Sequence, residues 1–399
     1  MTLDFTTVAA SEFAKFKGGS GFPTRYQGSK SGHFPFFKVS DMNNPGNERM
    51  MIRANNYITE EQRQEIGAVV IPAGAVVFAK VGAAVFLERK RVLAQDSCID
   101  NNMAAMIADP LRARTSFVYY QLTAFQLSSL VATTALPSLN GSQLRSIPLA
   151  LPPTLEEQDR IVQALSDADR MIAKLERLIG KKQAIKRGMM QQLLTGKTRL
   201  PGYGNDWVSC RFGDIALPIK ERANPSDMPA ETEVVELEHL GSGTGALEAS
   251  GVLSNSVSEK TRFRAGDVLF GKLRAYLRKY WLADRGGLCS TEIWALRAQP
   301  GRAIGGFVRY LVESDSFVEA ASASHGTHMP RSEWRIVSSL ELRVPRIDEQ
   351  RAIAGVLLDS DREITTLRTY LQRARLIKQG MLQELLTGRT RLTAGEDVT

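Results

Sequence analysis

The 399-residue sequence contains few of the residues from which most catalytic and metal sites are built. Its three cysteines (Cys98, Cys210 and Cys289) and four histidines never stand at the short spacings of a structural zinc site. Widely spaced cysteines also favour a reducing environment. No apolar run approaches the roughly 18 residues of a membrane span, and the N-terminus lacks the basic and apolar regions of a secretory signal. We therefore expect a cytoplasmic protein with no metal ion and no membrane partner.

Motifs for binding nucleotides or methyl donors are incomplete. TGKTR at 195–199 resembles the end of a phosphate-binding loop, but Gln191 stands where the first glycine belongs. GSGTGA at 241–246 follows a strand-like segment, as an adenosylmethionine loop would, yet EASGVLSNS interrupts the helix that should come next. No NPPY-type, DPPY-type, HExxH or GxSxG motif is present. The sequence predicts no catalytic residues, and a stand-alone adenine methyltransferase using 241–246 is the enzymatic alternative.

What the sequence does contain is one unit that occurs twice. Residues 153–200 align without a gap on residues 345–392, and 22 of the 48 positions are identical. The same offset of 192 relates GAVVFAK at 74–80 to GDVLFGK at 266–272. An offset of 193 relates TALPS at 134–138 to THMPR at 327–331. The repeat therefore includes globular parts, which have diverged further than the rest.

Aromatic residues separate the globular parts from the others. Of the 29 aromatic residues, only Tyr370 lies within the two well-matched segments. We predict globular modules at 1–152 and 201–344, helical spacers at 153–200 and 345–392, and a tail at 393–399. Short Val, Ile and Phe runs between Gly and Pro predict strands in the modules, and a few longer stretches predict helices. The expected fold class is α+β, with two mixed α/β modules joined by two long helices.

Each spacer shows a heptad pattern of apolar residues at steps of four and three. Gly196 and Gly388 are suited to the left-handed position that ends a helix. Two matching helices of about 58 Å predict an antiparallel coiled coil with a pseudo-twofold repeat, although parallel pairing is also open. The predicted seam is Ile161, Leu165, Ala168, Ile172, Leu175 and Ile179 with Ile353, Leu357, Ser360, Ile364, Leu367 and Leu371, continued after a phase shift by Ile185, Met189, Leu193 and Ile377, Met381, Leu385.

The net charge of +8 favours a nucleic-acid partner. Much of it lies in the spacers, which hold 10 basic against 6 acidic and 9 basic against 6 acidic residues. Acidic residues come early and basic residues late in each spacer, which also complements the helix dipole. The charge leaves two interpretations open, a phosphate-binding role and a purely structural one in which the coiled coil is only a scaffold.

The doubled pattern P-x-x-x-E-Q-x-x-I, a heptad helix and K-x-G-M-x-Q-x-L-L-T-G-[KR]-T-R-L resembles the specificity subunit (HsdS) of type I restriction–modification systems. FPFFKVSDMN at 34–43 and DWVSCRFGDIA at 206–216 also look like segments that begin recognition domains in that family. The resemblance covers essentially the whole chain.

The resemblance implies a non-catalytic subunit with two target recognition domains, each reading half of a bipartite double-stranded DNA sequence. Because the modules differ, we expect unlike half-sites. The spacers would act as a ruler and as docking surface for two methyltransferase (HsdM) subunits, with restriction (HsdR) subunits joining them. Adenosylmethionine, ATP and Mg would belong to those partners, and this chain would hold no cofactor of its own.

Candidate DNA contacts are side chains able to reach base edges or phosphates from predicted loops. Lys80 and Lys272 occupy equivalent places after their strands, and Arg331 corresponds to Ser138. Each candidate is alternatively a solvated surface residue. The candidates are Arg25, Tyr26, Gln27, Ser29, Lys30, Lys38, Ser40, Asp41, Asn43, Lys80, Thr133 and Ser138 in the first module, and His239, Lys272, Arg274, Tyr276, Arg278, Lys279, His325, His328 and Arg331 in the second.

Overall fold

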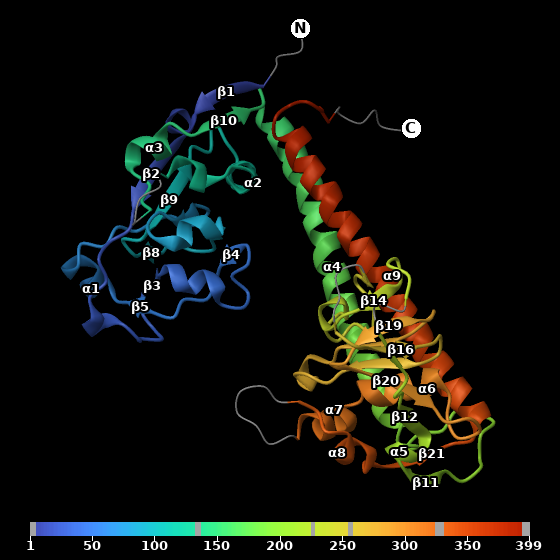
Figure 1. The fold of residues 1–399 in the computed structure, drawn as a ribbon. Helices are drawn as coiled ribbons and strands as arrows, with labels where there is room; N and C mark the ends of the chain where they lie inside the picture. The colour runs from blue at the N-terminus through green and yellow to red at the C-terminus, as the bar shows by residue number, and fades with distance from the viewer. Residues whose placement is uncertain (1–4, 132–136, 225–227, 254–257, 324–330, 393–399) are drawn as a thin grey trace. The chain divides into compact units, whose positions relative to one another are not determined.

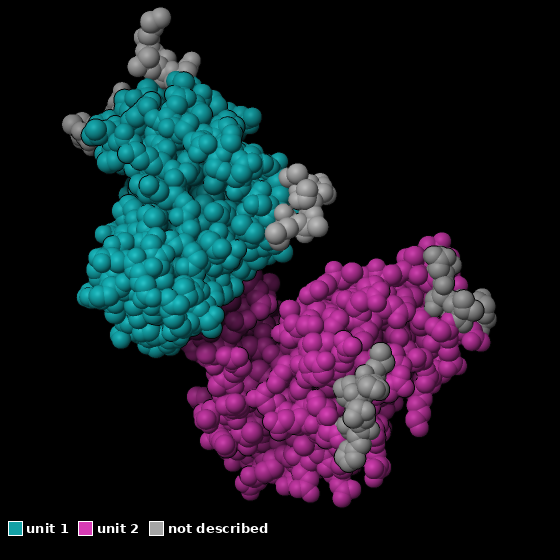
Figure 2. All heavy atoms as spheres, turned by 90° about the vertical axis from the view of Figure 1, so that its left-hand side faces the viewer, with its two compact units in different colours: residues 1–174, 370–399 teal, residues 175–369 magenta. Residues whose placement is uncertain are grey.

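A computed structural model describes residues 5–131, 137–224, 228–253, 258–323 and 331–392 (Figure 1). The chain forms two compact units, residues 1–174 with 370–399 (unit 1) and residues 175–369 (unit 2), shown in two colours in Figure 2. Each unit combines a globular module with part of both long helices. Over the described ranges, no helix has the length and apolarity needed to cross a membrane.

The module of unit 1 is built on three sheets, with strand orders β1-β10, β2-β9-β6-β7-β4 and β5-β3-β8. Apolar side chains of the central sheet, such as Val76, Phe78 and Met106, fill the core. The strands are β1 (Thr6–Ala9), β2 (Ala14–Gly18), β3 (Phe34–Phe37), β4 (Met50–Met51), β5 (Tyr57–Ile58), β6 (Val76–Ala79), β7 (Lys90–Leu93), β8 (Cys98–Ile99), β9 (Met103–Ala108) and β10 (Pro148–Leu151).

The module of unit 2 repeats this plan, with strand orders β11-β21, β12-β20-β17-β18 and β13-β16-β19-β14-β15. Its core includes Val268, Phe270 and Leu296 at the corresponding places. The strands are β11 (Val208–Arg211), β12 (Ala216–Pro218), β13 (Arg222–Ala223), β14 (Glu233–Val235), β15 (Gly251–Val252), β16 (Lys260–Phe263), β17 (Val268–Gly271), β18 (Tyr280–Leu282), β19 (Gly287–Ser290), β20 (Ile293–Ala298) and β21 (Glu341–Val344).

Backbone pairing confirms the equivalences predicted from the repeat. Lys80 N donates to Asn102 O at 2.8 Å, and Lys272 N donates to Glu292 O at 2.9 Å. The residue after each lysine forms an isolated bridge, Val81 with Ser138 and Leu273 with Arg331. The two modules are therefore copies of one fold, down to the segment that precedes each spacer.

One helix in each module packs between the sheet and the spacer. Phe117 on α2 and Phe307 on α6 are fully buried, and Tyr120 and Tyr310 follow them at the same spacing. The module helices are α1 (Glu60–Glu65), α2 (Thr115–Ala124), α3 (Gly141–Arg145), α5 (Phe212–Ile215), α6 (Gly305–Glu313), α7 (Asp315–Ser322) and α8 (Trp334–Ser338).

The two spacers form helices of equal length, α4 (Leu155–Leu193) and α9 (Ile347–Leu385), of 39 residues each. In unit 1, Ile161 and Leu165 near the start of α4 cluster with Leu385 and Leu386 at the end of α9. In unit 2, the start of α9 clusters in the same way with the end of α4. The helices thus run antiparallel within each unit (Figure 1), and the predicted α+β class with two long helices is confirmed.

Most of the predicted seam lies inward, but the prediction was wrong for the first residue of its continuation on each helix. Ile185 and Ile377 are 45% and 64% exposed, and the lysine after Ile185, Lys186, is 7% exposed. The apolar pattern misleads here because Lys186 has two acidic partners, described below, that allow its side chain to be buried. Of the other seam residues, Ile161, Leu165, Leu175, Ile179, Leu193, Ile353, Leu357, Ile364 and Leu385 are buried, and Ala168, Ile172, Met189, Ser360, Leu367, Leu371 and Met381 are half-buried.

The predicted glycine ends of both long helices are confirmed. Gly196 and Gly388 have φ of 69° and 72°, a conformation that other residues rarely adopt. A Cβ on Gly196 would meet the Trp207 ring at 3.3 Å, and one on Gly388 would meet the Phe5 ring at 2.6 Å. An aromatic ring at the start of each module therefore packs directly on the backbone where a long helix ends.

Candidate DNA-binding and docking surfaces

The module of unit 1 gathers several predicted DNA contacts into one amide-rich patch. Lys38 Nζ donates to Gln27 Oε1 at 3.2 Å, and Lys30 Nζ donates to Asn55 O at 3.2 Å. The side chains of Asn44 and Asn55 bond at 3.3 Å. Gln27, Lys30 and Asn55 are exposed. This amide patch offers the side-chain types that pair with adenine edges and phosphates.

A buried turn beneath the patch holds these side chains in place. Asp41 is fully buried and accepts hydrogen bonds from Lys38 N at 2.7 Å and Asn55 N at 3.3 Å. Burial raises the pKa of Asp41 above its ordinary value. Asn47, also buried, donates to Asp41 O and to Arg53 O, both at 2.8 Å. The prediction that Asp41 contacts DNA is therefore wrong, because its carboxylate organises the turn from inside.

The remaining predicted DNA contacts of this module differ in exposure and in whether their side chains bond within the module. Arg25 pairs with Glu65 at 2.7 Å, and the Tyr26 hydroxyl donates to the same carboxylate. Ser29 donates to a neighbouring carbonyl, whereas Ser40 and Asn43 are exposed. Lys80 is half-buried, Ser138 lies in the bridge to Val81, and Thr133 lies outside the described residues.

Sequence reasoning missed Asn44 and Asn55. The signal that pointed to them is the run of five asparagines between 43 and 56, in which only Asn43 was selected.

The basic residues predicted as DNA contacts between 272 and 279 do not all face outward in the module of unit 2. Arg278 donates to Glu313 O at 2.7 Å and pairs with Asp315, and Lys279 Nζ donates to Leu237 O at 2.8 Å. These cations hold loops together within the module, and their contact with DNA stays a prediction.

Other candidates in this module are also engaged internally. Arg331 pairs with Glu292, burial lowers the pKa of Lys272, and His239 Nδ1 accepts from Glu236 N at 3.0 Å. Among the described candidates of this module, Arg274, Tyr276 and Arg331 are exposed. His325 and His328 lie outside the described residues.

The GSGTGA segment at 241–246 is a loop, as predicted. Bridges join Leu240 to Leu247 and Ser242 to Lys279, and no α-helix begins in the described residues 247–253 that follow the segment. A nucleotide loop needs the N-terminus of a helix to receive the phosphates. The geometry of this segment therefore does not support the methyltransferase alternative.

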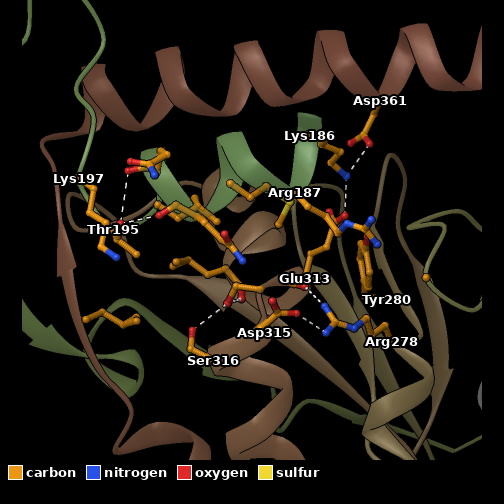
Figure 3. Close-up of a pocket in the computed structure, with 18 of the residues that line it drawn as sticks. Lys186, Arg187, Thr195, Lys197, Arg278, Tyr280, Glu313, Asp315, Ser316 and Asp361 are labelled. Atoms are coloured by element: carbon orange, nitrogen blue, oxygen red, sulfur yellow. Dashed lines mark hydrogen bonds and ion pairs between the residues drawn. The ribbon is translucent and has the colours of Figure 1, made fainter. Parts of the chain in front are cut away.

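A buried charged cluster fixes the module of unit 2 to both long helices (Figure 3). Asp361 on α9 pairs with Lys186 of α4 at 2.6 Å and with Arg309 of α6 at 2.7 Å. Tyr310 donates its hydroxyl to Asp361 at 2.9 Å, and Glu313 pairs with Lys186 at 2.5 Å. We call these residues the Asp361 cluster. The side chains of Lys186 and Arg309 are each 9% exposed, so their charges depend on these partners.

Unit 1 holds the equivalent Asp169 cluster. Asp169 on α4 pairs with Lys378 of α9 at 2.5 Å and accepts the Tyr120 hydroxyl at 2.7 Å. Desolvation raises the pKa of Tyr120 to about 12. Arg49, which precedes β4, lies 3.7 Å from Asp169 and 5.4 and 5.3 Å from the ring centroids of Tyr119 and Tyr120.

A bidentate ion pair accompanies each cluster. Arg199, after α4, places two nitrogens 2.6 and 2.7 Å from the carboxylate of Glu349. Arg391, after α9, does the same with Glu157 at 2.8 and 2.6 Å. Both glutamate side chains are at most 3% exposed. The Glu of the P-x-x-x-E-Q pattern therefore binds the Arg of the T-G-[KR]-T-R pattern that follows the opposite helix.

The glutamine of the same pattern binds the module. Gln158 accepts from Arg114 N at 2.7 Å and donates to Arg112 O at 3.0 Å. Gln350 accepts from Ile304 N at 3.1 Å and donates to Arg302 O at 2.8 Å. In both units these bonds fix the turn at the start of α2 or α6. The repeated motif thus encodes the attachment of a module to the start of each long helix.

This duplicated attachment agrees with comparisons to known proteins. Residues 3–187 match the family described as the type I restriction modification DNA specificity domain, and the attachment motif repeats in the second half of the chain. Residues 3–187 therefore carry a type I specificity domain.

Over the aligned stretches, the chain is between a fifth and a quarter identical to curated specificity subunits. It is 23% identical over 283 residues to the EcoDI specificity subunit of Escherichia coli, and the match covers 62% of this chain and 63% of that one. It is 22% identical over 333 residues to the MjaVIII specificity subunit of Methanocaldococcus jannaschii, covering 77% and 76%. The match thus spans less than two thirds of the length of the EcoDI relative.

Two solved structures share the fold over nearly their whole length. The S subunit of a type I restriction–modification system from M. genitalium has a TM-score of 0.58 at 13% identity, covering 98% of this chain and 97% of that chain. A chain from a structure of the assembly and conformational transition of the type I R-M system has a TM-score of 0.60 at 15% identity, covering 97% and 98%. At these identities the likeness concerns the fold alone.

Proposed function

We propose that this chain is the non-catalytic specificity subunit of a type I restriction–modification complex and that each module reads one half of a bipartite, asymmetric DNA target. The duplicated attachment carries the proposal. The same Asp, Lys, Tyr, Glu, Gln and Arg contacts fix both modules, whereas the loops that the modules present differ. A shared frame that holds two unlike surfaces suits recognition of two unlike half-sites.

Docking of two identical methyltransferase subunits is supported by residues that occur at equivalent positions of both helices and lie outside the core. Ile185 and Gly188 on α4 recur as Ile377 and Gly380 on α9, and both isoleucines are exposed. No atom lies within 4 Å of a Cβ placed on either glycine. An exposed isoleucine beside a glycine lets a partner helix approach closely.

The remaining partners and cofactors follow from the same proposal. Restriction subunits would join through the methyltransferase subunits, and adenosylmethionine, ATP and Mg would be bound in those partners. The complex would act in the cytoplasm.

Genome-wide mapping of methylated adenines, with and without this gene, tests DNA recognition. We expect one asymmetric bipartite motif that disappears with the gene. Removing one heptad from both α4 and α9 should narrow the gap between the half-sites without changing either of them, because the attachment residues stay in phase. A symmetric motif, altered half-sites or no dependence on the gene would contradict the proposal.

Docking is tested by the variants Ile185→Asp and Ile377→Asp. Each should lower the number of co-purified methyltransferase subunits from two to one, and the double variant should lower it to none, because a buried charge would oppose helix packing. Leu178→Asp, at an exposed position of α4 whose counterpart is Tyr370, is the control. Unchanged stoichiometry in the double variant would refute docking at this stripe.

A further inference from the structure

Unit 2 contains a groove of about 1620 Å³ that neither DNA reading nor the repeated docking stripe explains (Figure 3). Its walls are the last turns of α4, the middle of α9, the β11–β21 sheet and the junction of α6 and α7. An α-helix with its side chains is about 10 Å across and rises 1.5 Å per residue, so this volume is that of roughly a dozen helical residues.

The floor of the groove is apolar and its rim is basic. Met190, Leu194, Leu311 and Ile364 line the floor and are nearly buried. Five exposed cations line the groove, and none of them takes part in an ion pair within the described parts of the chain: Arg187, Lys197, Arg211, Arg343 and Arg368.

The acids of the groove do not balance these cations. Glu313 and Asp361 are neutralised in the Asp361 cluster, and Asp315 pairs with Arg278. Asp214 and Glu341 remain, so five cations face two acids and the surplus is three positive charges. Duplex DNA presents only negative charge and no apolar face along its backbone. An apolar floor with charges of both signs fits a polypeptide better.

Among the described residues, the repeat-equivalent positions of the other copy form no such basic rim. By strand register, Ala9 and Ala150 take the places of Arg211 and Arg343. At the offset of 192, Gln379 and Glu176 replace Arg187 and Arg368. Only Lys197 has a basic counterpart, Arg389.

A glutamine also closes the corresponding place in unit 1. Gln121 Nε2 donates to Ala150 O at 2.6 Å and to Leu386 O at 2.9 Å, so it ties β10 to the end of α9. Its counterpart in unit 2 is Leu311, which cannot form these bonds and instead lines the groove beside Leu194, the counterpart of Leu386. The two ends of the repeat therefore differ in both charge and closure.

We propose that this groove binds one acidic helical segment of a partner protein, and that the chain offers this site once. The apolar side chains of the segment would cover Leu311 and Leu194, and its acidic side chains would pair with the five cations. This site goes beyond the proposed function, because the stripe of Ile185 and Ile377 occurs twice whereas the groove occurs in unit 2.

A fluorescein-labelled peptide of about 14 residues, roughly 21 Å long as a helix, tests the proposal by fluorescence anisotropy on the full chain. Leucines spaced three and four apart form one face of the peptide and glutamates form the other. We expect saturable binding with one peptide per chain. A peptide with lysines in place of the glutamates should not bind.

The variant Arg187→Gln/Arg211→Ala/Arg343→Ala/Arg368→Glu introduces around the groove the residues found at the repeat-equivalent positions, so each replacement is compatible with the fold. It should weaken peptide binding by roughly tenfold or more, because four of the five cations that pair with the glutamates are removed together. Arg389→Ala, at the basic counterpart in unit 1, is the matched control and should leave binding unchanged. Circular dichroism verifies that the variant is folded.

Several results would overturn the proposal. They are an absence of saturable binding, binding of two peptides per chain, and binding that the fourfold variant leaves intact. Displacement of the peptide by a DNA duplex would assign the cations to phosphates, and a dimer that the fourfold variant dissolves would assign the groove to a second copy of the chain. Loss of the methylation motif in the fourfold variant would concern the proposed function instead, because peptide binding is measured without DNA.

Discussion

The Asp361 cluster of unit 2 and the Asp169 cluster of unit 1 solve the same attachment problem with different surroundings. Both keep the aspartate, the lysine from the opposite helix and the tyrosine hydroxyl. In unit 2 the arginine comes from α6, and a second acid, Glu313, balances the two cations. In unit 1 the arginine is Arg49, from a distant loop, with a side chain 37% exposed.

The difference shows which part of the interaction the fold requires. Arg309 in unit 2 corresponds to Tyr119 in unit 1, yet a guanidinium lies over the equivalent tyrosine ring in both, at 4.1 Å from Tyr310 and 5.3 Å from Tyr120. A cation beside the aspartate and the ring is retained, whereas its origin in the chain is not. In unit 1, that origin couples the attachment to the segment that carries the amide patch.

The largest difference between the units should come from removing the aspartate charge. Asp361→Asn leaves Glu313 as the only acid beside Lys186 and Arg309. We expect the free energy of unfolding of unit 2 to fall by about 3–5 kcal/mol. Asp169→Asn should lower the free energy of unfolding of unit 1 by about 1–2 kcal/mol, because water screens the charge of the more exposed Arg49. Hydrogen exchange of each unit measures both losses. Equal losses would show that the two clusters are energetically alike.

Removing the aromatic ring on each helix-ending glycine should have a somewhat smaller effect. Trp207 is 6% exposed, and Trp207→Ala should cost about 3 kcal/mol. Phe5 is only half-buried, and Phe5→Ala should cost about 1–2 kcal/mol. Denaturant unfolding followed in each unit measures the two effects. A larger loss for Phe5→Ala would reverse the ranking by burial.

The amide patch separates the units by function. If Gln27 and Asn55 read bases, the double variant Gln27→Ala/Asn55→Ala should lower discrimination at one half-site by about 1–3 kcal/mol for each bidentate pair of hydrogen bonds that it removes. The other half-site should remain unchanged. Gln64→Ala, which removes an exposed amide on α1 of the same module, is the control. Methylation mapping that shows relaxation at both half-sites, or at neither, would refute the assignment.

The smallest effect concerns alkaline pH. The pKa of Tyr120 is raised to about 12 by burial, whereas an unfolded tyrosine titrates near 10. Because the pKa is higher in the folded state, protonated Tyr120 contributes fully to the stability of unit 1 below pH 10. This contribution declines as the pH rises towards 12, by about 1 kcal/mol at pH 11. Tyr120→Phe should remove this part of the decline in unit 1, while Tyr310→Phe should not. Thermal unfolding between pH 9 and 11 measures it.

Much of the architecture could be predicted because a repeat exposes what a single copy hides. The gapless match of the spacers gave two helices of equal length and their glycine ends, and the offset gave the equivalence of Lys80 with Lys272. The seam failed at Ile185 because periodicity records where apolar residues stand. It does not record that Lys186 forms an ion pair with Asp361 on another helix.

The binding surfaces were harder to predict for a related reason. Arg278, Lys279 and Arg331 look like contacts for DNA in the sequence, but their partners come from segments up to about 40 residues away and are visible only in three dimensions. The internal hydrogen bonds of Asp41 are invisible in the sequence for the same reason. Conversely, the pairing of Arg49 with Asp169 joins residues 120 positions apart and has no counterpart in the other repeat.

The bonds of Gln121 to Leu386 and of Glu157 to Arg391 have a consequence for the order in which the protein is completed. Unit 2 is one continuous stretch, so all of its parts leave the ribosome together. Unit 1 begins first, but its attachment closes only when residues 385–392 have been synthesised. Domains generally fold as they emerge. The module that is synthesised first is thus the last to complete its contacts with the long helices. A chain that ends between the repeats would contain this module without residues 385–392, to which it is attached.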